Sequence, residues 1–346
     1  MLQIEKRDSE RVVYHEPSIT HWLNQRYEHD TTYPASPIER LQFRIESQGL
    51  TVYNPAPVII EGVLHLWGRT EPAGIQETGG SVVLYTKSLD GLWDAVPEAP
   101  VFEGLQDPFD CGIIDGYHVI GGNKVYEVPG DPNLGYCTAL YRYRNTLTEL
   151  IGADGHIVEP FVLGPPKMKG IRVVELGPGR KGVFTRPQKP GFGDRGQIGY
   201  FEISSLDDLQ ASLTEYDQRN DQTSLLAGLF ISGEWGGINQ AIALDNGHIF
   251  ALGHIAGFYP QEERKQYYPM SFTFHPQDRS VHDFTLLATD REYPQDITPK
   301  KADLGTIYYP GGIVLIEGVP VVFYGLGDST TGSKNYRLMG SFPSYA

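Results

Sequence analysis

The chain has 346 residues, 40% of them hydrophobic and 21% charged, so it is long enough for one large domain or two ordinary ones. Its formal net charge of −15 argues against a general nucleic-acid binder and against docking on anionic lipid, because both need clustered Lys and Arg. With 40 glycines, 25 prolines and 12% aromatic residues, the composition favours short strands and turns over helices.

The sequence also predicts a compartment. The N-terminus, MLQIEKRDSE, is charged from the start and has no apolar run, so we expect no signal peptide. No stretch approaches the roughly 20 apolar residues of a membrane span. The two cysteines, Cys111 and Cys137, lack metal-ligand spacing and cannot form a disulfide framework. We therefore predict a cytoplasmic protein with no nucleic-acid or membrane partner.

Hairpin patterns follow one another along the chain after an N-terminal extension, residues 1–45, in which SITHWLNQRY (18–27) is typical of a short helix. Each pattern is an apolar strand, a turn glycine and a second apolar strand. The hairpins cover residues 53–69, 106–123, 171–187, 234–258 and 308–325, with turn glycines Gly62, Gly116, Gly179, Gly247 and Gly318. Asn246 and Gly247 predict a tight primed turn in the fourth hairpin. SSLDDLQASL (204–213) predicts one capped helical turn.

The spacing of these hairpins indicates the fold. Successive turn glycines lie 54, 63, 68 and 71 residues apart, so five repeated units fill most of the chain. A unit of this length holds about four strands, and a closed ring of such units is a β-propeller. We predict an all-β, five-bladed β-propeller over residues 46–346, with residues 1–45 closing the ring or covering one face. Two stacked β-sandwiches are the alternative, but they would not explain a repeated hairpin with a polar end.

Polar residues gather at one end of these hairpins. The residues seven past the turn glycines are Arg69, Asn123, Arg186, His254 and Gly325, and the last leads to Asp328. The first strands begin with Asn54, Asp107, Asn239 with Gln240, and Tyr308 with Tyr309. Because the innermost strands of a propeller point one end at its axis, we expect these residues to converge on one polar cup.

Positive charge in that cup predicts an anion site. Arg69, Arg186 and His254 share one register, and planar guanidinium groups suit phosphate or carboxylate. Taken singly, each polar residue has a simpler explanation as a turn former or a hydrogen-bonded core group. An unpaired buried guanidinium is costly, however, which favours the site.

Asp107 is the candidate acid. Phe109 and Leu105 flank it, and an apolar border can raise the pKa of a carboxyl group enough for general-acid work. The alternative is a plain Asp-Pro turn. Glu71 is a second carboxylate, with a simple ion pair to an arginine as its alternative. Aromatic residues suited to a sugar cup lie near the same hairpin ends: Trp67, Phe258, Tyr259, Tyr267, Tyr268 and Tyr309.

Several motifs together resemble a known family. They are NPAP with the following WGR, the DP of QDPF, FTRPQ, GYFEISSLDDL, GHIAG and FYGLGDS, spread from about residue 50 to about residue 330. The sequence resembles the five-bladed β-mannoside phosphorylase superfamily. It is most similar to the mannosyltransferase/phosphorylases that turn over β-1,2-mannan (mannogen), long carried as a domain of unknown function.

The resemblance implies roles for individual residues. Asp107 would be the single catalytic acid, which protonates the glycosidic oxygen through a sugar hydroxyl while phosphate attacks the anomeric carbon from the other face. Phosphate would be bound by Arg186 and His254, with Arg172 and Lys169 as further candidates. Mannose would be held by Asn54, Arg69, Glu71 and Asp328. Position at the hairpin ends adds Asn123, Asn239, Gln240 and Tyr309 to the expected sugar-binding set.

The expected function is therefore that of an inverting β-1,2-mannoside phosphorylase or mannosyltransferase. Its partners would be a manno-oligosaccharide and either phosphate, with mannose 1-phosphate, or GDP-mannose; no cofactor or metal is expected. The sequence shows no clear second carboxylate to activate a water, which favours phosphorolysis or transfer over hydrolysis.

Three alternatives stay open. One is a glycoside hydrolase of the same fold, and another is a non-catalytic carbohydrate-binding propeller. The third is a calcium-dependent propeller lactonase or hydrolase. Oxygen ligands for calcium would come from Glu71, Asn54, Asn123, Asn239 and Asp328.

Overall fold

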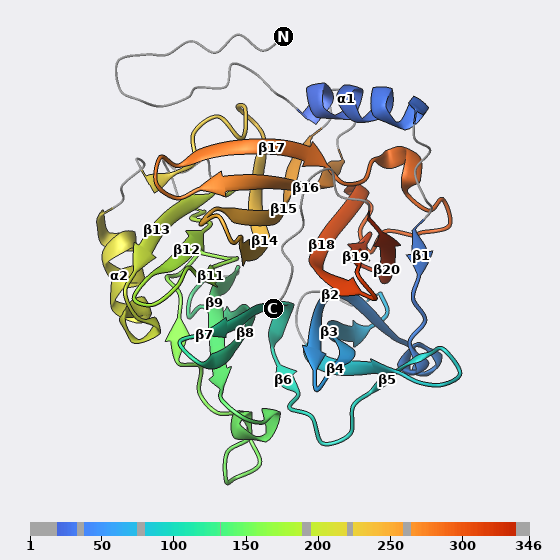
Figure 1. Ribbon diagram of the computed structural model, residues 1–346. Coiled ribbons are helices and arrows are strands. Elements are labelled where there is room, and N and C mark those ends of the chain that lie inside the picture. The colour runs from blue at the N-terminus through green and yellow to red at the C-terminus, as the bar shows by residue number, and fades with distance from the viewer. Residues whose placement is uncertain are drawn as a thin grey trace.

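The computed structural model describes residues 19–32, 38–74, 80–131, 133–188, 195–219, 224–258 and 264–336. Strands predominate in this part of the chain, and they form antiparallel groups that succeed one another around a common centre (Figure 1). The prediction of an all-β architecture is confirmed.

The first three groups are separate sheets. The first contains β2 (Leu50–Ile60), β3 (Val63–Pro72), β4 (Ser81–Lys87) and β5 (Trp93–Ala95), and β6 (Phe102–Glu103) pairs with β4. The second contains β7 (Leu105–Ile114), β8 (Tyr117–Glu127), β9 (Leu134–Tyr143) and β10 (Val162–Leu163). The third contains β11 (Arg172–Glu175), β12 (Lys181–Thr185) and β13 (Gly199–Ile203).

The last two groups share one 8-stranded sheet. The fourth contains β14 (Trp235–Ala243), β15 (Ile249–Phe258), β16 (Lys265–His275) and β17 (Ser280–Leu286). The fifth contains β18 (Leu304–Ile316), β19 (Val319–Leu326), β20 (Thr330–Asn335) and β1 (Glu39–Arg40). A short parallel contact between β16 and β18 joins the two groups, whereas every pairing within a group is antiparallel.

Helices are few in the described residues, and they lie outside the groups of strands. They are α1 (Ile19–Thr32) and α2 (Leu209–Arg219), with 3-10 turns η1 (Arg44–Gln48), η2 (Leu147–Leu150), η3 (Leu206–Asp208) and η5 (Asp290–Glu292). The helix expected at 18–27 continues to Thr32, and its first residue lies outside the described part. Within these ranges no helix is long and apolar enough to cross a bilayer.

The capped turn expected at 204–213 is longer than predicted. The Ser205 side chain accepts a hydrogen bond from the amide of Asp207, which caps η3 as expected. The chain then continues as α2, because Leu209 and Leu213 bury one side of the helix against the second and third groups. Packing of this apolar face extends the helix beyond what its cap alone would sustain.

The five predicted hairpins are all present, but the fourth has a different turn. Asn246 and Gly247 do not form a two-residue primed turn. The strands end at Ala243 and resume at Ile249, and only Gly247 of the pair has a positive φ. Hydrogen bonds from Gly247 N to Leu244 O and from Leu244 N to His248 O define a wider loop, a type I turn closed by a left-handed glycine.

The first strands of the groups contact one another around the centre. Contacts join β2 to β7, β7 to β11, β11 to β14, β14 to β18 and β18 back to β2. Four of these strands carry a β-bulge: β2 between Tyr53 and Ala56, β7 between Gln106 and Phe109, β14 between Ile238 and Gln240, and β18 between Pro310 and Gly312. Since a bulge re-aims the side chains around it, these strands present residues to the centre that a regular strand would not.

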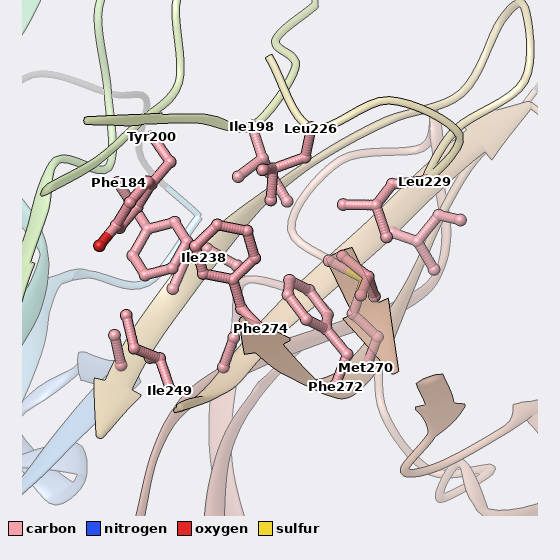
Figure 2. Close-up of a cluster of buried hydrophobic side chains, with 14 of the residues drawn as sticks. Phe184, Ile198, Tyr200, Leu226, Leu229, Ile238, Ile249, Met270, Phe272 and Phe274 are labelled. Atoms are coloured by element: carbon pink, nitrogen blue, oxygen red, sulfur yellow. The ribbon is translucent and has the colours of Figure 1, made fainter. Parts of the chain in front are cut away.

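Apolar cores fill the spaces between neighbouring groups. Figure 2 shows the core between the third and fourth groups, to which β12 and β13 contribute Phe184 and Tyr200 while β16 contributes Phe272 and Phe274. The helix α1 extends this core, because Trp22 stacks on Phe284 of β17 with ring centroids 4.2 Å apart. In Figure 1, α1 lies beside the end of β17.

The division at residue 45 remains a prediction. Within residues 1–45, α1 packs on the fourth group and β1 pairs with β20 of the fifth. Residues 1–18 and 33–37 lie outside the described part of the chain.

Candidate functional site

The strand bulges hold three of the predicted site residues. Asn54, Asp107 and Asn239 each lie at the bulge of a first strand, in β2, β7 and β14. The residues expected at the ends of the second strands lie opposite the same region. The cross-strand partners are Tyr53 with Arg69, Gln106 with Asn123, Gly237 with His254, and Tyr309 with Gly325. Hairpin register therefore places these polar residues around the centre.

Asn54 and Asp107 share an unusual backbone conformation. Their φ angles are 50° and 49°, and both residues precede a proline. Asn and Asp tolerate this left-handed region better than most residues, which explains their presence at the two bulges. A Cβ on Gly325 would lie 1.9 Å from Oδ1 of Asn54. The fifth hairpin thus ends in glycine because the Asn54 side chain occupies the space.

The Asp107 carboxylate is held from three directions. Its Oδ1 accepts hydrogen bonds from Asn54 Nδ2 at 2.8 Å and from Arg69 Nη1 at 3.3 Å. Its Oδ2 accepts one from Asn123 Nδ2 at 3.0 Å. The Asp107 side chain is 15% exposed, so it is largely enclosed yet open to a ligand. These contacts fix the carboxylate in one orientation.

The expectation that an apolar border raises the pKa of Asp107 is wrong. Burial does push this pKa upward, but Arg69, Lys169 and the amides of Asn54 and Asn123 outweigh it and lower the pKa to about 2. Charge-assisted hydrogen bonds stabilise the ionised form more than desolvation disfavours it. Asp107 is therefore a carboxylate at neutral pH in the free protein.

Glu71 forms an ion pair with an arginine, which was the alternative to a role as a second site carboxylate. Its Oε2 accepts hydrogen bonds from Arg69 Nε at 3.3 Å and Nη2 at 3.2 Å. Its Oε1 accepts one from the Tyr53 hydroxyl at 2.6 Å and another from the ammonium group of Lys300. Arg69 thus bridges Glu71 and Asp107, and this network orients the guanidinium group toward the catalytic candidate.

Asp328 lies in the same electrostatic cluster, at a φ of 52°. Its pKa is raised, first by burial and then by the negative charges of Asp107 and Glu71, while Arg69 and Lys300 oppose the shift. Asp107 and Asp328 thus have pKa values displaced in opposite directions.

A cationic cluster lies next to Asp107. The Arg172 Nε donates to the backbone oxygen of Asn239 at 2.6 Å, and its guanidinium lies 3.4 Å from the centroid of the Phe109 ring. Arg186 Nη2 donates to the backbone oxygen of Arg195 at 3.2 Å, whereas its buried Nε has no hydrogen-bond partner among the residues that the structure describes. A Cβ on Gly170 would lie 3.9 Å from both Arg172 Nη1 and Arg186 Cδ, so the two arginines meet there.

Burial lowers the pKa of both Arg172 and Arg186, and the charge of Asp107 opposes this in each case. Arginine stays charged throughout the physiological range, so the cluster keeps its positive charge. Two partly desolvated guanidinium groups, one with an unpaired Nε–H, make a binding site for an anion. Lys169 lies 4.7 Å from the Tyr136 ring centroid and acts on the pKa of Asp107, which places it at the edge of this cluster.

His254 borders the same cluster and is only 4% exposed. Its Nδ1 lies 2.8 Å from Oδ1 of Asn239. Burial, followed by the charges of Arg186 and Arg172, lowers its pKa well below the ordinary value, with Asp107 opposing. The imidazole is therefore neutral at physiological pH.

The remaining predicted residues differ in their surroundings. Burial and then the charge of Asp107 raise the pKa of Tyr309 to about 12, whereas Arg172, Asn239 and Arg186 lower it, which places Tyr309 in the anion cluster. Gln240 uses its Oε1 to accept a hydrogen bond from the Ile313 amide at 2.7 Å, which ties β14 to β18. Tyr259, expected among the aromatic residues, lies outside the described part of the chain.

Two site residues were missed by the sequence analysis, Tyr53 and Lys300. Hairpin register carried a signal for Tyr53, because it lies directly opposite Arg69. Lys300 lies in the irregular segment before β18, where no periodic pattern points to the centre. Among the described residues there is no group of three or more His, Cys, Asp or Glu that could hold a metal ion.

The fold and the site together define a class of protein. Its antiparallel groups of strands repeat around a centre, and this centre holds one fixed carboxylate beside a cationic cluster. A family model described as "Protein of unknown function (DUF1861)" matches residues 31–336, and the chain belongs to this family. A search among curated proteins finds no match.

Solved structures extend the comparison. The chain is similar to MPT-4, a mannose phosphorylase from Leishmania mexicana in complex with phosphate ion, with 27% identity over 91% of this chain and 92% of that chain and a TM-score of 0.74. It is also similar to MPT-1, a GDP-Man-dependent mannosyltransferase from Leishmania mexicana, with 26% identity over 93% and 96% and a TM-score of 0.74. The predicted resemblance to the mannoside phosphorylase superfamily is confirmed.

A more distant structure shares the fold alone. It is a beta-1,2-mannobiose phosphorylase from Listeria innocua, with 12% identity over 87% of this chain and 94% of that chain and a TM-score of 0.55.

Proposed function

We propose that this protein is a five-bladed β-propeller enzyme that transfers a mannosyl group between a β-1,2-linked manno-oligosaccharide and phosphate, with inversion at the anomeric carbon. The five antiparallel groups are the blades, residues 46–346 form the catalytic domain, and β1 completes the last blade. The closed circuit of contacts among β2, β7, β11, β14 and β18 supports this arrangement. Both cysteines, Cys111 and Cys137, are free, in keeping with a cytoplasmic enzyme.

One observation carries the proposal: the Asp107 carboxylate, fixed by Asn54, Arg69 and Asn123, lies beside the cluster of Arg172 and Arg186. A glycoside phosphorylase needs this combination of one carboxyl group for the leaving oxygen and one cationic site for the attacking phosphate. The similarity to a mannose phosphorylase and a mannosyltransferase indicates mannose as the transferred sugar.

Asp107 must gain a proton before it can act as the acid. In the free protein Arg69 and Lys169 hold its pKa low. A phosphate anion bound beside Lys169 and Arg186 offsets part of that positive charge and adds a negative charge near the carboxylate. Both effects raise the pKa of Asp107. Binding of phosphate therefore prepares the acid, and the proton passes through a hydroxyl of the bound mannose to the glycosidic oxygen.

The other site residues hold the sugar in this scheme. Arg69, Glu71 and Asp328 surround the carboxylate and offer donors and acceptors to mannose hydroxyls, as Asn54 and Asn123 do from the neighbouring strands. Hydrolysis is less well supported, because the carboxylates of Glu71 and Asp107 are already engaged by Arg69 and neither is free to activate a water.

The calcium-dependent alternative is also less well supported. Its ligand set includes Glu71, which forms ion pairs with Arg69 and Lys300. Two cationic side chains therefore already bind the carboxylate that would have to bind calcium. Calcium needs several oxygen ligands that are free to converge on it.

The test is to incubate the full chain with β-1,2-manno-oligosaccharides and inorganic phosphate and to look for mannose 1-phosphate. A parallel reaction supplies GDP-mannose with an oligosaccharide acceptor. Formation of mannose 1-phosphate supports phosphorolysis, whereas elongation from GDP-mannose alone supports the mannosyltransferase alternative. Release of free mannose without phosphate would identify a hydrolase and overturn the proposal. Binding of oligosaccharide without any turnover would identify a carbohydrate-binding protein.

A further inference from the structure

One contact fixes which nitrogen of His254 carries the proton. Oδ1 of Asn239 faces Nδ1 of the imidazole. Because a carbonyl oxygen can only accept, Nδ1 of His254 must donate across the 2.8 Å separation.

The neutral ring then has a lone pair at its other nitrogen. With Nδ1 protonated, Nε2 is an acceptor, and it has no hydrogen-bond partner among the described residues. The groups around the ring are Asp107 on β7, Arg172 on β11, Arg186 after β12, Tyr267 on β16 and Tyr309 on β18. Two of these are cationic and disfavour a second proton on the imidazole.

The ring also lies next to the anion-binding arginine. A Cβ on Gly237 would lie 3.3 Å from Arg186 Nε and 3.4 Å from His254 Cε1, the carbon bonded to Nε2. The Nε–H donor of Arg186, which has no partner among the described residues, and the acceptor side of the His254 ring therefore lie near each other beside Gly237. An anion bound between them would meet a donor from one residue and a lone pair from the other.

We propose that the anion bound here brings its own proton: the hydroxyl of hydrogen phosphate donates to Nε2 of His254 while its other oxygens accept from Arg186. The site then favours phosphate over sulfate, and over the phosphodiester oxygens of a sugar nucleotide, because neither of these carries a proton near neutral pH. This inference rests on the proposed phosphorolysis and specifies its anionic substrate.

The test compares two anions of similar size. Phosphate and sulfate binding to the full chain is measured by isothermal titration calorimetry from about pH 6 to about pH 8, the range in which an ordinary histidine changes charge. We expect phosphate to bind roughly 10- to 100-fold more tightly than sulfate at neutral pH, since an oxygen facing an unpaired lone pair loses a hydrogen bond and is repelled. Sulfate affinity should stay low across this range, because the lowered pKa of His254 keeps its imidazole neutral there.

Two variants locate the effect. His254→Lys offers only donors, so it should strengthen sulfate more than phosphate and bring their affinity ratio close to one. Arg186→Lys should weaken both anions and preserve the ratio. GDP-mannose should bind less tightly than phosphate to the unmodified protein. Binding of mannose alone is measured as well, so that the contribution of the sugar to the affinity of GDP-mannose can be subtracted.

Equal affinities for phosphate and sulfate in the unmodified protein at neutral pH would overturn the inference while leaving phosphorolysis intact. So would a preference for phosphate that His254→Lys leaves unchanged in a folded protein. Failure to bind phosphate at all, together with absence of mannose 1-phosphate, would instead remove the proposed function itself.

Discussion

Lys300 and Glu71 form an ion pair between the segment that precedes β18 and strand β3 of the first group. Their side chains are 9% and 3% exposed, so the pair lies almost entirely out of water. The same Glu71 orients Arg69, and Arg69 contacts Asp107. A residue far from the first group in sequence therefore supports the geometry of the catalytic candidate.

Replacing Lys300 with Met should destabilise the protein, because Glu71 then keeps fewer partners for a buried charge. We expect a loss of about 1–3 kcal/mol in the free energy of unfolding, measured by urea denaturation. Lys265→Met is the matched control: Lys265 pairs with Asp303 at 2.7 Å, but their side chains are 32% and 50% exposed. Such a pair should be worth less than about 1 kcal/mol. Equal losses in the two variants would contradict the supporting role of Lys300.

Asp107→Asn should abolish most of the activity, because the amide cannot deliver a proton to the leaving oxygen. The expected loss of mannose 1-phosphate formation is at least about 100-fold. Asp110→Asn is the control, since Asp110 lies on the same strand and is not among the groups that bond to Asp107. Near-ultraviolet circular dichroism verifies that both variants fold. Full activity in folded Asp107→Asn would show that another residue is the acid.

Asp110 also gives a prediction on pH. Burial raises its pKa to about 6, opposed only by a hydrogen bond from the Gly112 amide. A raised pKa means that the folded state holds the proton more tightly than the unfolded chain, so this contribution to stability is present at low pH and is lost as the pH rises through about 6. Asp110→Asn should therefore be more stable than the unmodified protein at neutral pH. The difference should shrink as the pH falls toward about 4. Thermal denaturation across this range measures it; an unchanged difference would contradict the shifted pKa.

Gly325→Ala should disturb the site through packing. The new methyl group would lie 1.9 Å from Oδ1 of Asn54, so Asn54 must move and lose its hydrogen bond to Asp107. We expect a stability loss of about 1–3 kcal/mol together with reduced activity. Gly257→Ala is the comparison, because its methyl group would meet the flexible end of Ile19 at 3.2 Å and make ordinary contacts with Glu234 Cγ at 3.7 Å and Gly233 O at 4.0 Å. If Gly325→Ala were as active as Gly257→Ala, the contact between Gly325 and Asn54 would have no bearing on catalysis.

Hairpin register made much of the site predictable. Counting from the turn glycines selected Arg69, Asn123 and His254, and in the structure these residues lie opposite Tyr53, Gln106 and Gly237 at the bulges of the first strands. The local pattern determines such contacts because antiparallel strands joined by a short turn can pair in few ways. The repeat length likewise predicted the succession of antiparallel groups.

Properties that depend on several groups at once were harder to predict. The pKa of Asp107 is set by Arg69 on β3 and Lys169 before β11, so its sequence neighbours Leu105 and Phe109 were a poor guide. Lys300 was missed for a related reason, because an irregular segment has no periodicity that reveals where its side chains point. The turn at Asn246 differed because that dipeptide also suits a wider loop.

The pairing of β1 with β20 has a consequence for how the chain matures. Glu39 lies opposite Ser333, so it finds its partner only after the residues of all the intervening groups have been made. Contacts of such long sequence separation slow folding, and until they form, β20 has an unpaired edge that can associate with other chains. The newly made protein should therefore depend on chaperones more than its finished stability suggests, and truncation near residue 330 should leave an aggregating product instead of a smaller folded one.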